Sequence, residues 1–267
     1  MIFLTEENYF SKENEVKYIG SSQFKDFLKC EYEALQKVKG EVEEEKSTAL
    51  LASSYIDEYF SGTLDKFKEN HPEMFSSRGE SKGQLKSEYK YLDDIIAQAE
   101  NDPKFLKYIS GEHQVIMTGE IEGVPVKIKI DSYFKNKCIV DLKAVKDFNL
   151  IWNDKDHCKD NFIDFYSYTI QAAIYQEIVR QNTGQELPFI IAALTKEKIS
   201  ERALLNIPQD IINEKLKFVK SHIKRFKDIK DGLIEPQKCG RCDCCKSIAK
   251  VINIYNYKDY FEMRGGI

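Results

Sequence analysis

Three consecutive stretches between residues 112 and 145 alternate apolar and polar residues, and short turn-forming segments separate them at "EG" and at "KNK" (residues 135–137). A period of two is typical of β-strands, whereas glycine and short polar segments are typical of the turns between strands. The pattern therefore predicts a meander of three strands. This feature constrains the fold most, because a hairpin fixes which residues of its two strands lie opposite one another.

Helical patterns lie on both sides of the predicted meander. Before it, apolar residues recur at helical spacing in three segments, residues 21–40, 47–62 and 87–109, and residues 65–85 are polar and predict an irregular excursion. After it, the patterns predict a helix, a buried strand and a long amphipathic helix, at residues 166–184, 188–196 and 208–229. Strands with helices on both sides of them in sequence indicate an α/β or α+β sheet with helical cover.

The chain has 267 residues, of which 42% are hydrophobic and 31% charged, a balance typical of a folded protein. We find no internal repeat and expect a single domain over residues 1–267. It would comprise a helical N-terminal region (about 20–109), the core, and a cysteine-containing C-terminal tail (about 236–267). The start "MIFLTEENYF" lacks the pattern of a signal peptide, and the apolar run "FIIAAL" is too short to cross a bilayer. We therefore expect a cytoplasmic protein without membrane contact.

The net charge of −4 gives no global positive field that would indicate nucleic-acid binding. A nuclease that holds metal ions through acidic residues needs only a local basic groove. Several lysines surround the third predicted strand and could form one: Lys129, Lys135, Lys137, Lys143 and Lys146. The alternative is a solvated lysine face without a function.

The third strand, "IVDLKAV", carries Asp141 and Lys143 on one face, because residues two apart in a strand point the same way. If residues 135–137 form the hairpin loop, paired residue numbers sum to 272 and Asp131 lies opposite Asp141. Opposed carboxylates destabilise a sheet, and a divalent cation such as Mg²⁺ offsets their repulsion. Lys143 would then reach a phosphate or the attacking water. A loop of two or four residues would shift the register and send Asp131 to the other face.

The order of motifs resembles a known family. The run "GEIEGVPVKIKIDSYFKNKCIVDLKAVKDF", followed by "IWND" and "YTIQAAIYQEIV", resembles the PD-(D/E)XK nuclease superfamily and its RecB-type branch with a Q-x-x-x-Y motif. It is most similar to the exodeoxyribonuclease VIII-like (RecE-like) exonucleases of phages and prophages, over residues 20–250. The resemblance implies an α/β, restriction-endonuclease-like core, in which a mixed β-sheet is flanked by helices on both faces.

The resemblance also implies roles for particular residues. Asp131 and Asp141 would bind Mg²⁺ or Mn²⁺, and Lys143 would be the catalytic lysine. The Q-x-x-x-Y pair that supports the site and the substrate strand corresponds to Gln171 and Tyr175, four apart on one helix face. An additional acidic ligand could come from Glu112 or Glu120. Many RecB-type nucleases have a histidine where this chain has Asp57, so a ligand there would be a carboxylate or absent.

Cysteines near the C-terminus, in "CGRCDCC", have the spacing C-x₂-C-x₂-C, which lets Cys239, Cys242 and Cys245 converge on one ion, with Cys244 as a spare. A fourth ligand must come from elsewhere, and Cys30 is the candidate. Some RecB-type nucleases resemble this layout and hold an iron–sulfur cluster that joins the chain ends. The four cysteines could therefore bind Zn²⁺ or an iron–sulfur cluster, or they could be reduced free thiols without a metal.

These observations predict a Mg²⁺-dependent exodeoxyribonuclease that hydrolyses DNA from duplex ends. The resemblance implies a role in phage-type recombination, in which DNA is the substrate and a single-strand annealing protein is a partner. The protein could also form an oligomer. One alternative is a structure-specific or restriction-type endonuclease with the same core. Another is a catalytically silent DNA-binding module held together by the cysteine metal site.

Overall fold

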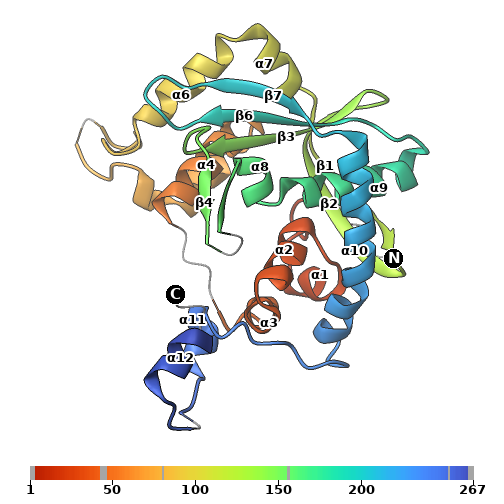
Figure 1. The fold of residues 1–267 in the computed structure, drawn as a ribbon. Helices are drawn as coiled ribbons and strands as arrows, with labels where there is room; N and C mark the ends of the chain where they lie inside the picture. The colour runs from red at the N-terminus through yellow and green to blue at the C-terminus, as the bar shows by residue number, and fades with distance from the viewer. Residues whose placement is uncertain (1–3, 43–46, 80, 155–156, 252, 264–267) are drawn as a thin grey trace.

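The structure is a computed structural model, which describes residues 4–42, 47–79, 81–154, 157–251 and 253–263. The ends of the expected domain, residues 1–3 and 264–267, lie outside this part. At its centre is a five-stranded sheet of order β1-β2-β3-β6-β7 (Figure 1). Its strands are β1 Glu112–Ile121, β2 Val124–Phe134, β3 Cys138–Val145, β6 Phe189–Thr195 and β7 Arg202–Asn206. Strands β3 and β6 are parallel and the other neighbours antiparallel, so the sheet is mixed, as predicted.

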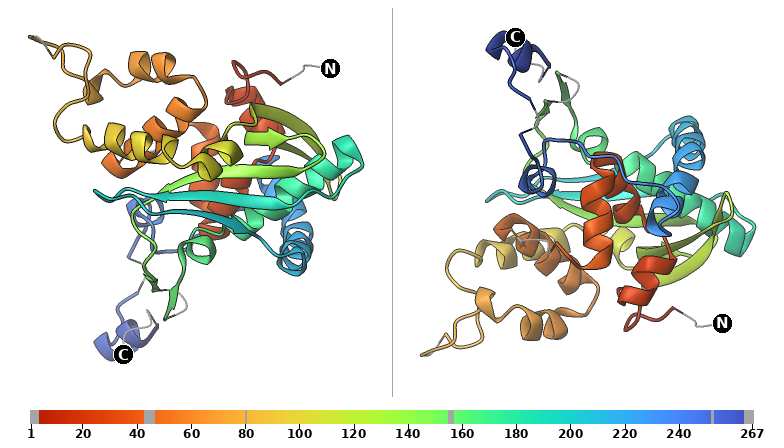
Figure 2. Two further views of the ribbon diagram at one scale, coloured as in Figure 1. Left: turned by 90° about the horizontal axis from the view of Figure 1, so that it is seen from above. Right: turned by 90° about the horizontal axis from the view of Figure 1, so that it is seen from below.

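Helices cover both faces of this sheet (Figure 2). The helices of one face are α2 Ser21–Lys29, α3 Glu31–Lys39, α9 Tyr168–Thr183 and α10 Gln209–Lys230, and those of the other are α4 Thr48–Phe60, α6 Tyr91–Glu100 and α7 Pro103–Ile109. Successive residues of β3 enter different cores: Ile139 packs with the first group, and Val140 and Leu142 pack with the second. The predicted fold class is confirmed.

The predicted register of the central hairpin is confirmed by the paired residues. Ser132 pairs with Val140, Tyr133 with Ile139 and Phe134 with Cys138, so the residue numbers of each pair sum to 272. The ladder stops after the first of these pairs. Asp131 and Asp141 are the next residues along the two strands, at the point where regular pairing ends.

The single helix predicted over residues 21–40 is wrong, because α2 and α3 are separate helices that meet at Cys30. This residue is extended, with φ −160° and ψ 109°, and it ends one helix and begins the next. Its N–H donates to the carbonyl of Asp26, and its carbonyl accepts from the N–H of Ala34. Apolar residues keep helical spacing across the junction, so periodicity alone does not reveal the break.

Other differences concern short elements. Residues 65–85 are not wholly irregular: helix α5 (Leu64–Asn70) and a 3₁₀ turn (η1, Pro72–Met74) bury Phe67 and Met74. The sequence prediction missed edge strand β7 and the hairpin of β4 (Ile151–Asn153) and β5 (Cys158–Asp160). The remaining short helices are α1 Lys12–Lys17, α8 Phe162–Phe165, α11 Asp243–Ser247 and α12 Tyr257–Met263. Such elements hold too few residues for a clear periodic signal.

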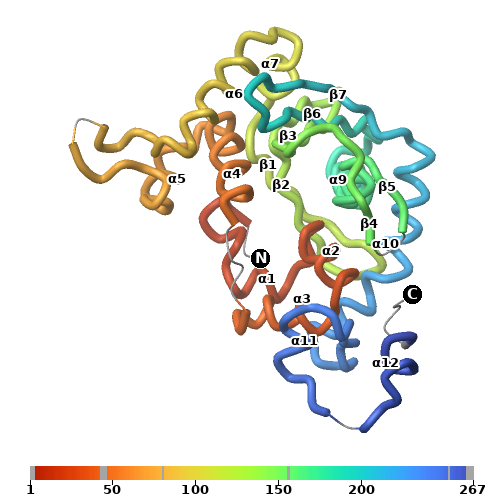
Figure 3. The backbone as a smooth tube through the Cα atoms, turned by 60° about the vertical axis from the view of Figure 1, so that its left-hand side comes forward, coloured from red at the N-terminus to blue at the C-terminus, as the bar shows by residue number. Residues whose placement is uncertain are grey.

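The C-terminal tail returns to the N-terminal helices, and α11 lies beside α3 (Figure 3). The side chain of Glu31 fixes this arrangement: it accepts two hydrogen bonds from Arg225 of α10, at 2.7 and 2.8 Å, and one from the N–H of Gln237 in the tail. Among the described helices, none combines the length and the apolar composition needed to cross a membrane.

Candidate functional site

Asp131 lies where strands β2 and β3 stop pairing. Its Oδ2 accepts a hydrogen bond of 3.0 Å from the N–H of Leu142, so the side chain takes a main-chain donor of β3 that regular pairing would otherwise use. Burial, and then the nearby charge of Asp141, raise the pKa of Asp131 to about 7. The hairpin therefore brings two carboxyl groups together, that of buried Asp141 and that of half-buried Asp131, as the register predicts.

Asp141 is 2% exposed and has two polar neighbours. Its Oδ1 accepts a 2.6 Å hydrogen bond from Nε2 of Gln171, on helix α9. Its Oδ2 lies 2.6 Å from Nζ of Lys143, on the same face of β3; this contact has the distance of an ion pair but not the angles of a hydrogen bond. The structure thus places three of the predicted site residues in direct contact.

Lys143 faces both carboxyl groups. Burial lowers the pKa of its ammonium group, but the charges of Asp141 and Asp131 together raise that pKa well above its ordinary value. The group is therefore charged at neutral pH. It can supply positive charge to a substrate but is poorly suited to accept a proton.

Tyr175 supports the site from a different direction than Gln171. Its hydroxyl donates a 3.0 Å hydrogen bond to the main-chain carbonyl of Lys129, two residues before Asp131 on β2. The two members of the predicted Q-x-x-x-Y pair thus contact neighbouring strands from one helix, Gln171 at the acidic side chain of β3 and Tyr175 at the backbone of β2. Together they hold the strands that carry the two carboxyl groups.

Asp57 approaches from helix α4. Burial, followed by the charge of Asp131, raises the pKa of Asp57 well above its ordinary range. A small pocket opens beside these two carboxyl groups and is lined by Asp57, Phe60, Ser61, Ile109, His113, Asp131, Ser132 and Leu142. Helix α4 therefore contributes a third carboxyl group next to Asp131.

Two other predicted acidic residues do not join this group. Glu120 is exposed and pairs with Pro125 at the distal end of the β1–β2 ladder. At about 3.3 Å per residue, that point lies roughly 20 Å along β2 from Asp131. Glu112 is exposed at the start of β1, opposite Tyr133.

The lysines of the hairpin loop, Lys135 and Lys137, are exposed beyond the paired end of the hairpin.

Two residues near the acidic pair were not predicted from the sequence, Lys25 and Tyr168. Nζ of Lys25 and Nζ of Lys143 lie 5.2 and 5.1 Å from the centroid of the Tyr168 ring, so two ammonium groups share one aromatic ring. Burial and the neighbouring charge of Lys143 lower the pKa of Lys25 to about 8. A lysine on an amphipathic helix carries no signal in sequence that distinguishes it from a solvated one.

The donor set fits a hard divalent cation. Burial and the charges of Asp131 and Asp141 raise the pKa of Asp57, and burial and the charge of Asp141 raise that of Asp131. Asp57 Oδ1 is buried and accepts no hydrogen bond from the residues that the structure describes, whereas Asp141 Oδ2 has the ammonium group of Lys143 as its neighbour at 2.6 Å. Buried carboxylate oxygens need a cation or a donor, and Mg²⁺ and Mn²⁺ prefer oxygen ligands of this kind.

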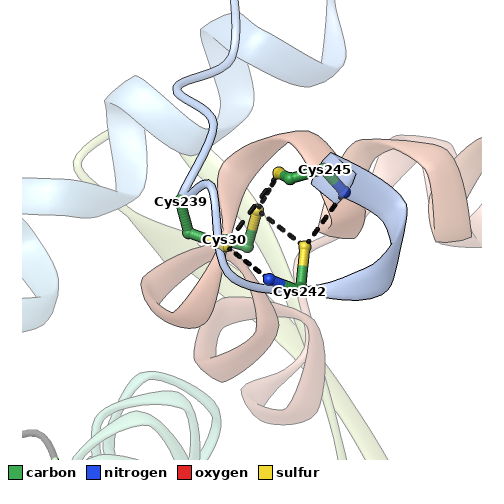
Figure 4. A group of neighbouring side chains, drawn as sticks. All are labelled: Cys30, Cys239, Cys242 and Cys245. Atoms are coloured by element: carbon green, nitrogen blue, oxygen red, sulfur yellow. Dashed lines mark hydrogen bonds between the residues drawn. The ribbon is translucent and has the colours of Figure 1, made fainter. Parts of the chain in front are cut away.

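The predicted cysteine ligands also come together (Figure 4). The sulfur atoms of Cys30, Cys239, Cys242 and Cys245 all lie within 4.8 Å of one another. Backbone N–H groups of Arg241 and Cys242 donate to Sγ of Cys239, at 3.4 and 3.3 Å. Burial raises the pKa of the Cys239 thiol, but these two donors outweigh it and lower the pKa to about 6. Burial, as the largest cause, raises the pKa of the Cys30 and Cys242 thiols instead, so in the absence of an ion the thiolate is favoured at Cys239.

Comparisons with known proteins agree with this geometry. Residues 20–248 match the model of a family described as a PDDEXK-like domain of unknown function (DUF3799). The crystal structure of a presumed exonuclease from Eubacterium rectale is 40% identical, covers 100% of both chains and superposes with a TM-score of 0.90. A second structure, SSO0001, covers 76% of this chain at 12% identity with a TM-score of 0.27, too low to support an argument. A search of curated proteins found no match. The chain belongs to the PDDEXK-like family described as DUF3799.

Proposed function

We propose that this protein is a DNA exonuclease that depends on Mg²⁺ or Mn²⁺ and hydrolyses phosphodiester bonds from duplex ends. The observation that carries the proposal is the contact of Asp141 with Lys143 and Gln171, next to Asp131. The similarity to a presumed exonuclease over the whole chain supports the exonuclease reading. The RecE-like branch remains our inference from the sequence motifs.

Asp131 and Asp141 would hold the divalent cation, and Asp57 is placed to add a third carboxylate. When bound, such an ion polarises a phosphoryl oxygen and stabilises the charge that develops during hydrolysis. The carboxyl groups themselves must be ionised to bind it. Because the pKa of Asp131 is about 7 without the ion, binding of the cation and loss of that proton are coupled.

The other residues of the site orient the carboxylates and supply positive charge. Gln171 donates to one oxygen of Asp141 and so orients its other oxygen toward Lys143. The ammonium group of Lys143 provides positive charge for the phosphate as it gains negative charge in the transition state. Lys25, whose ammonium group also lies beside the Tyr168 ring, adds a second cation from helix α2.

An aromatic path leads from these cations to the surface and is suited to a nucleic-acid strand. The ring of Tyr168 lies 5.7 Å from that of Tyr166, which lies 5.0 Å from that of Phe165. Tyr166 is 46% exposed, and Trp152 on strand β4 is 53% exposed. Exposed aromatic side chains beside cations provide stacking surfaces for bases and contacts for phosphates. This path would guide a strand end to the acidic pair.

The proposal is tested with linear and covalently closed circular duplexes of one sequence, each with Mg²⁺ and with a chelator. We expect Mg²⁺-dependent release of nucleotides from the linear duplex alone. Asp141→Asn should abolish that release and keep the fold, because it removes the charge of one metal-binding carboxylate. Asp210→Asn is the matched control, since Asp210 is an exposed carboxylate at the start of α10.

Cleavage of the circular duplex would instead identify an endonuclease. Binding of DNA without turnover, at any concentration of Mg²⁺ or Mn²⁺, would identify a silent binding module. Full activity of Asp141→Asn at ordinary Mg²⁺ would show that the chemistry takes place elsewhere in the molecule.

A further inference from the structure

The distances between the four cysteine sulfur atoms distinguish among the metal centres that such a group can hold. Sγ of Cys30 lies 3.5 Å from Sγ of Cys245 and 3.7 Å from Sγ of Cys242, and Cys239 lies 3.9 Å from Cys245. No pair is separated by more than 4.8 Å. The four atoms therefore form one compact group.

The distances between the sulfur atoms can be compared with those of a site that binds a single tetrahedral ion. With metal–sulfur bonds of about 2.3 Å, the sulfur atoms of a Cys₄ site lie about 3.8 Å apart. In an iron–sulfur cluster, thiolates bind different iron atoms, and those on different irons lie about 6 Å apart. The observed separations match the single ion, and the sulfur cage is too small for a cluster.

The backbone around the cysteines is arranged for the same purpose. Cys30 is extended between α2 and α3, and its buried thiol faces the tail. Cys242 caps α11, and its sulfur accepts from the N–H of Cys245 at 3.4 Å, as Cys239 accepts from two N–H groups of its own turn. These N–H groups favour thiolates over thiols, because a donor stabilises a negatively charged sulfur.

We propose that Cys30, Cys239, Cys242 and Cys245 bind one Zn²⁺ ion tetrahedrally, and that this ion is structural. All four positions belong to the protein, as in closed structural zinc sites, so none is open for substrate. Zinc is favoured over ferrous iron because it binds more tightly to a given set of ligands. This inference does not depend on the proposed nuclease activity.

The ion would join the tail to the helix that reaches the acidic pair. Cys30 follows the last residue of α2, and Lys25 lies on that helix, beside the Tyr168 ring. The N–H of Tyr32 donates to the carbonyl of Gln237, and Glu31 binds Gln237 and Arg225, so the tail already contacts the start of α3. Zinc would complete this attachment and fix the C-terminal end of α2.

The test measures the metal content of the full-length protein, purified without chelators and handled anaerobically. We expect one zinc per chain, with neither iron nor acid-labile sulfide. Cys30→Ser and Cys242→Ser should each reduce the zinc content to below about a tenth of that value. Cys244→Ser is the matched control: Cys244 lies between two of the ligands in sequence but outside the group, and this variant should keep its zinc.

A second measurement reads the geometry directly and does not need the variants to fold. Replacement of the bound metal by Co²⁺ should give the intense visible bands of a tetrahedral Co²⁺–thiolate site, because ligand geometry determines these bands. Octahedral Co²⁺ bands, iron with or without sulfide, or a protein without metal would each overturn the proposal. Loss of zinc from Cys244→Ser equal to that from Cys242→Ser would also overturn this choice of ligands.

Discussion

Gln171 and Asp141, thirty residues apart in sequence, are joined by a 2.6 Å hydrogen bond between Nε2 and Oδ1 in the interior of the protein. Gln171 belongs to helix α9, in which every residue from Thr169 to Val179 is buried, and Asp141 to a strand that is covered on both faces. The orientation of this carboxylate is therefore set by the packing of α9 on the sheet. A metal ligand held in this way gains affinity from its neighbour as well as from its own charge.

Replacement of Gln171 by alanine should weaken the site without removing it. We expect a loss of about 10- to 100-fold in Mg²⁺ affinity or in cleavage rate, the usual effect of removing a residue that orients a metal ligand. Mg²⁺ titration of activity measures it. Gln176→Ala is the control: Gln176 is also buried on α9, but it binds Leu187 and Gln209. It should cost stability and leave the Mg²⁺ dependence unchanged, and equal effects of the two variants would contradict this role of Gln171.

Replacement of Lys143 by alanine should affect the rate far more than the binding of DNA. The ammonium group remains charged and faces the carboxylates, so its contribution should be greatest when the phosphate gains charge. We expect the rate to fall about a hundred- to a thousandfold, as when one stabilising donor is removed from a transition state. Single-turnover kinetics and DNA affinity in Ca²⁺ separate the two effects. Lys146→Ala is the control, because the Lys146 side chain is 95% exposed. Parallel losses of affinity and rate would identify Lys143 as a binding residue.

Asp131 makes the stability of the metal-free protein depend on pH. Its pKa rises from 3.8 to about 7 on folding. Below pH 3.8 both the folded and the unfolded state hold the proton, so the stability does not change with pH through this group. Between the two values the unfolded chain loses the proton while the folded protein keeps it, and stability decreases as pH rises. Above about pH 7 both states are ionised and the decrease ends.

We therefore expect the free energy of unfolding, measured in a chelator, to fall less between pH 4 and pH 7 for Asp131→Asn than for the unmodified protein. Mg²⁺ should raise the melting temperature more at pH 8 than at pH 6, because it binds the ionised carboxylate. Asp210→Asn serves as the control and should keep both dependences. An Asp131→Asn protein that is still stabilised by Mg²⁺ to the same degree would place the ion elsewhere.

Much of the candidate site could be predicted from the sequence because it is built on local patterns. The alternation in β2 and β3 and the length of one hairpin loop suffice to place Asp131 beside Asp141. Spacing of four residues on α9 places Gln171 and Tyr175 on one face, but only the packed structure shows that they contact different strands. The site therefore follows from short-range rules up to the point at which helices pack on the sheet.

The features that the sequence did not reveal depend on contacts distant along the chain. Lys25 approaches Lys143 only because α2 ends at Cys30 and packs against α9, and no periodic signal marks that end. Strand β7 is short and lies at the edge of the sheet, where pairing with β6 stabilises it more than its own composition does. Glu120 was placed near the site by residue type alone, and the register puts it at the other end of β1.

The last prediction concerns the coupling of Cys30 and Cys242, which are 212 residues apart and whose sulfur atoms lie 3.7 Å from each other. If one ion binds both, it closes a very long loop, and its binding energy contributes to the stability of the folded state. Loss of either ligand releases the ion and its stabilising effect, so loss of the second ligand should lower the stability little further. Cys30→Ser and Cys242→Ser should each lower the free energy of unfolding by a similar amount, and the double variant should be little less stable than either.

Chemical denaturation measures the three free energies of unfolding. The pair Cys158→Ser and Cys244→Ser is an additive control, since neither cysteine belongs to the group. Additive losses for Cys30 and Cys242 would mean that the two thiols act independently, and no shared ion would then join the tail to helix α2.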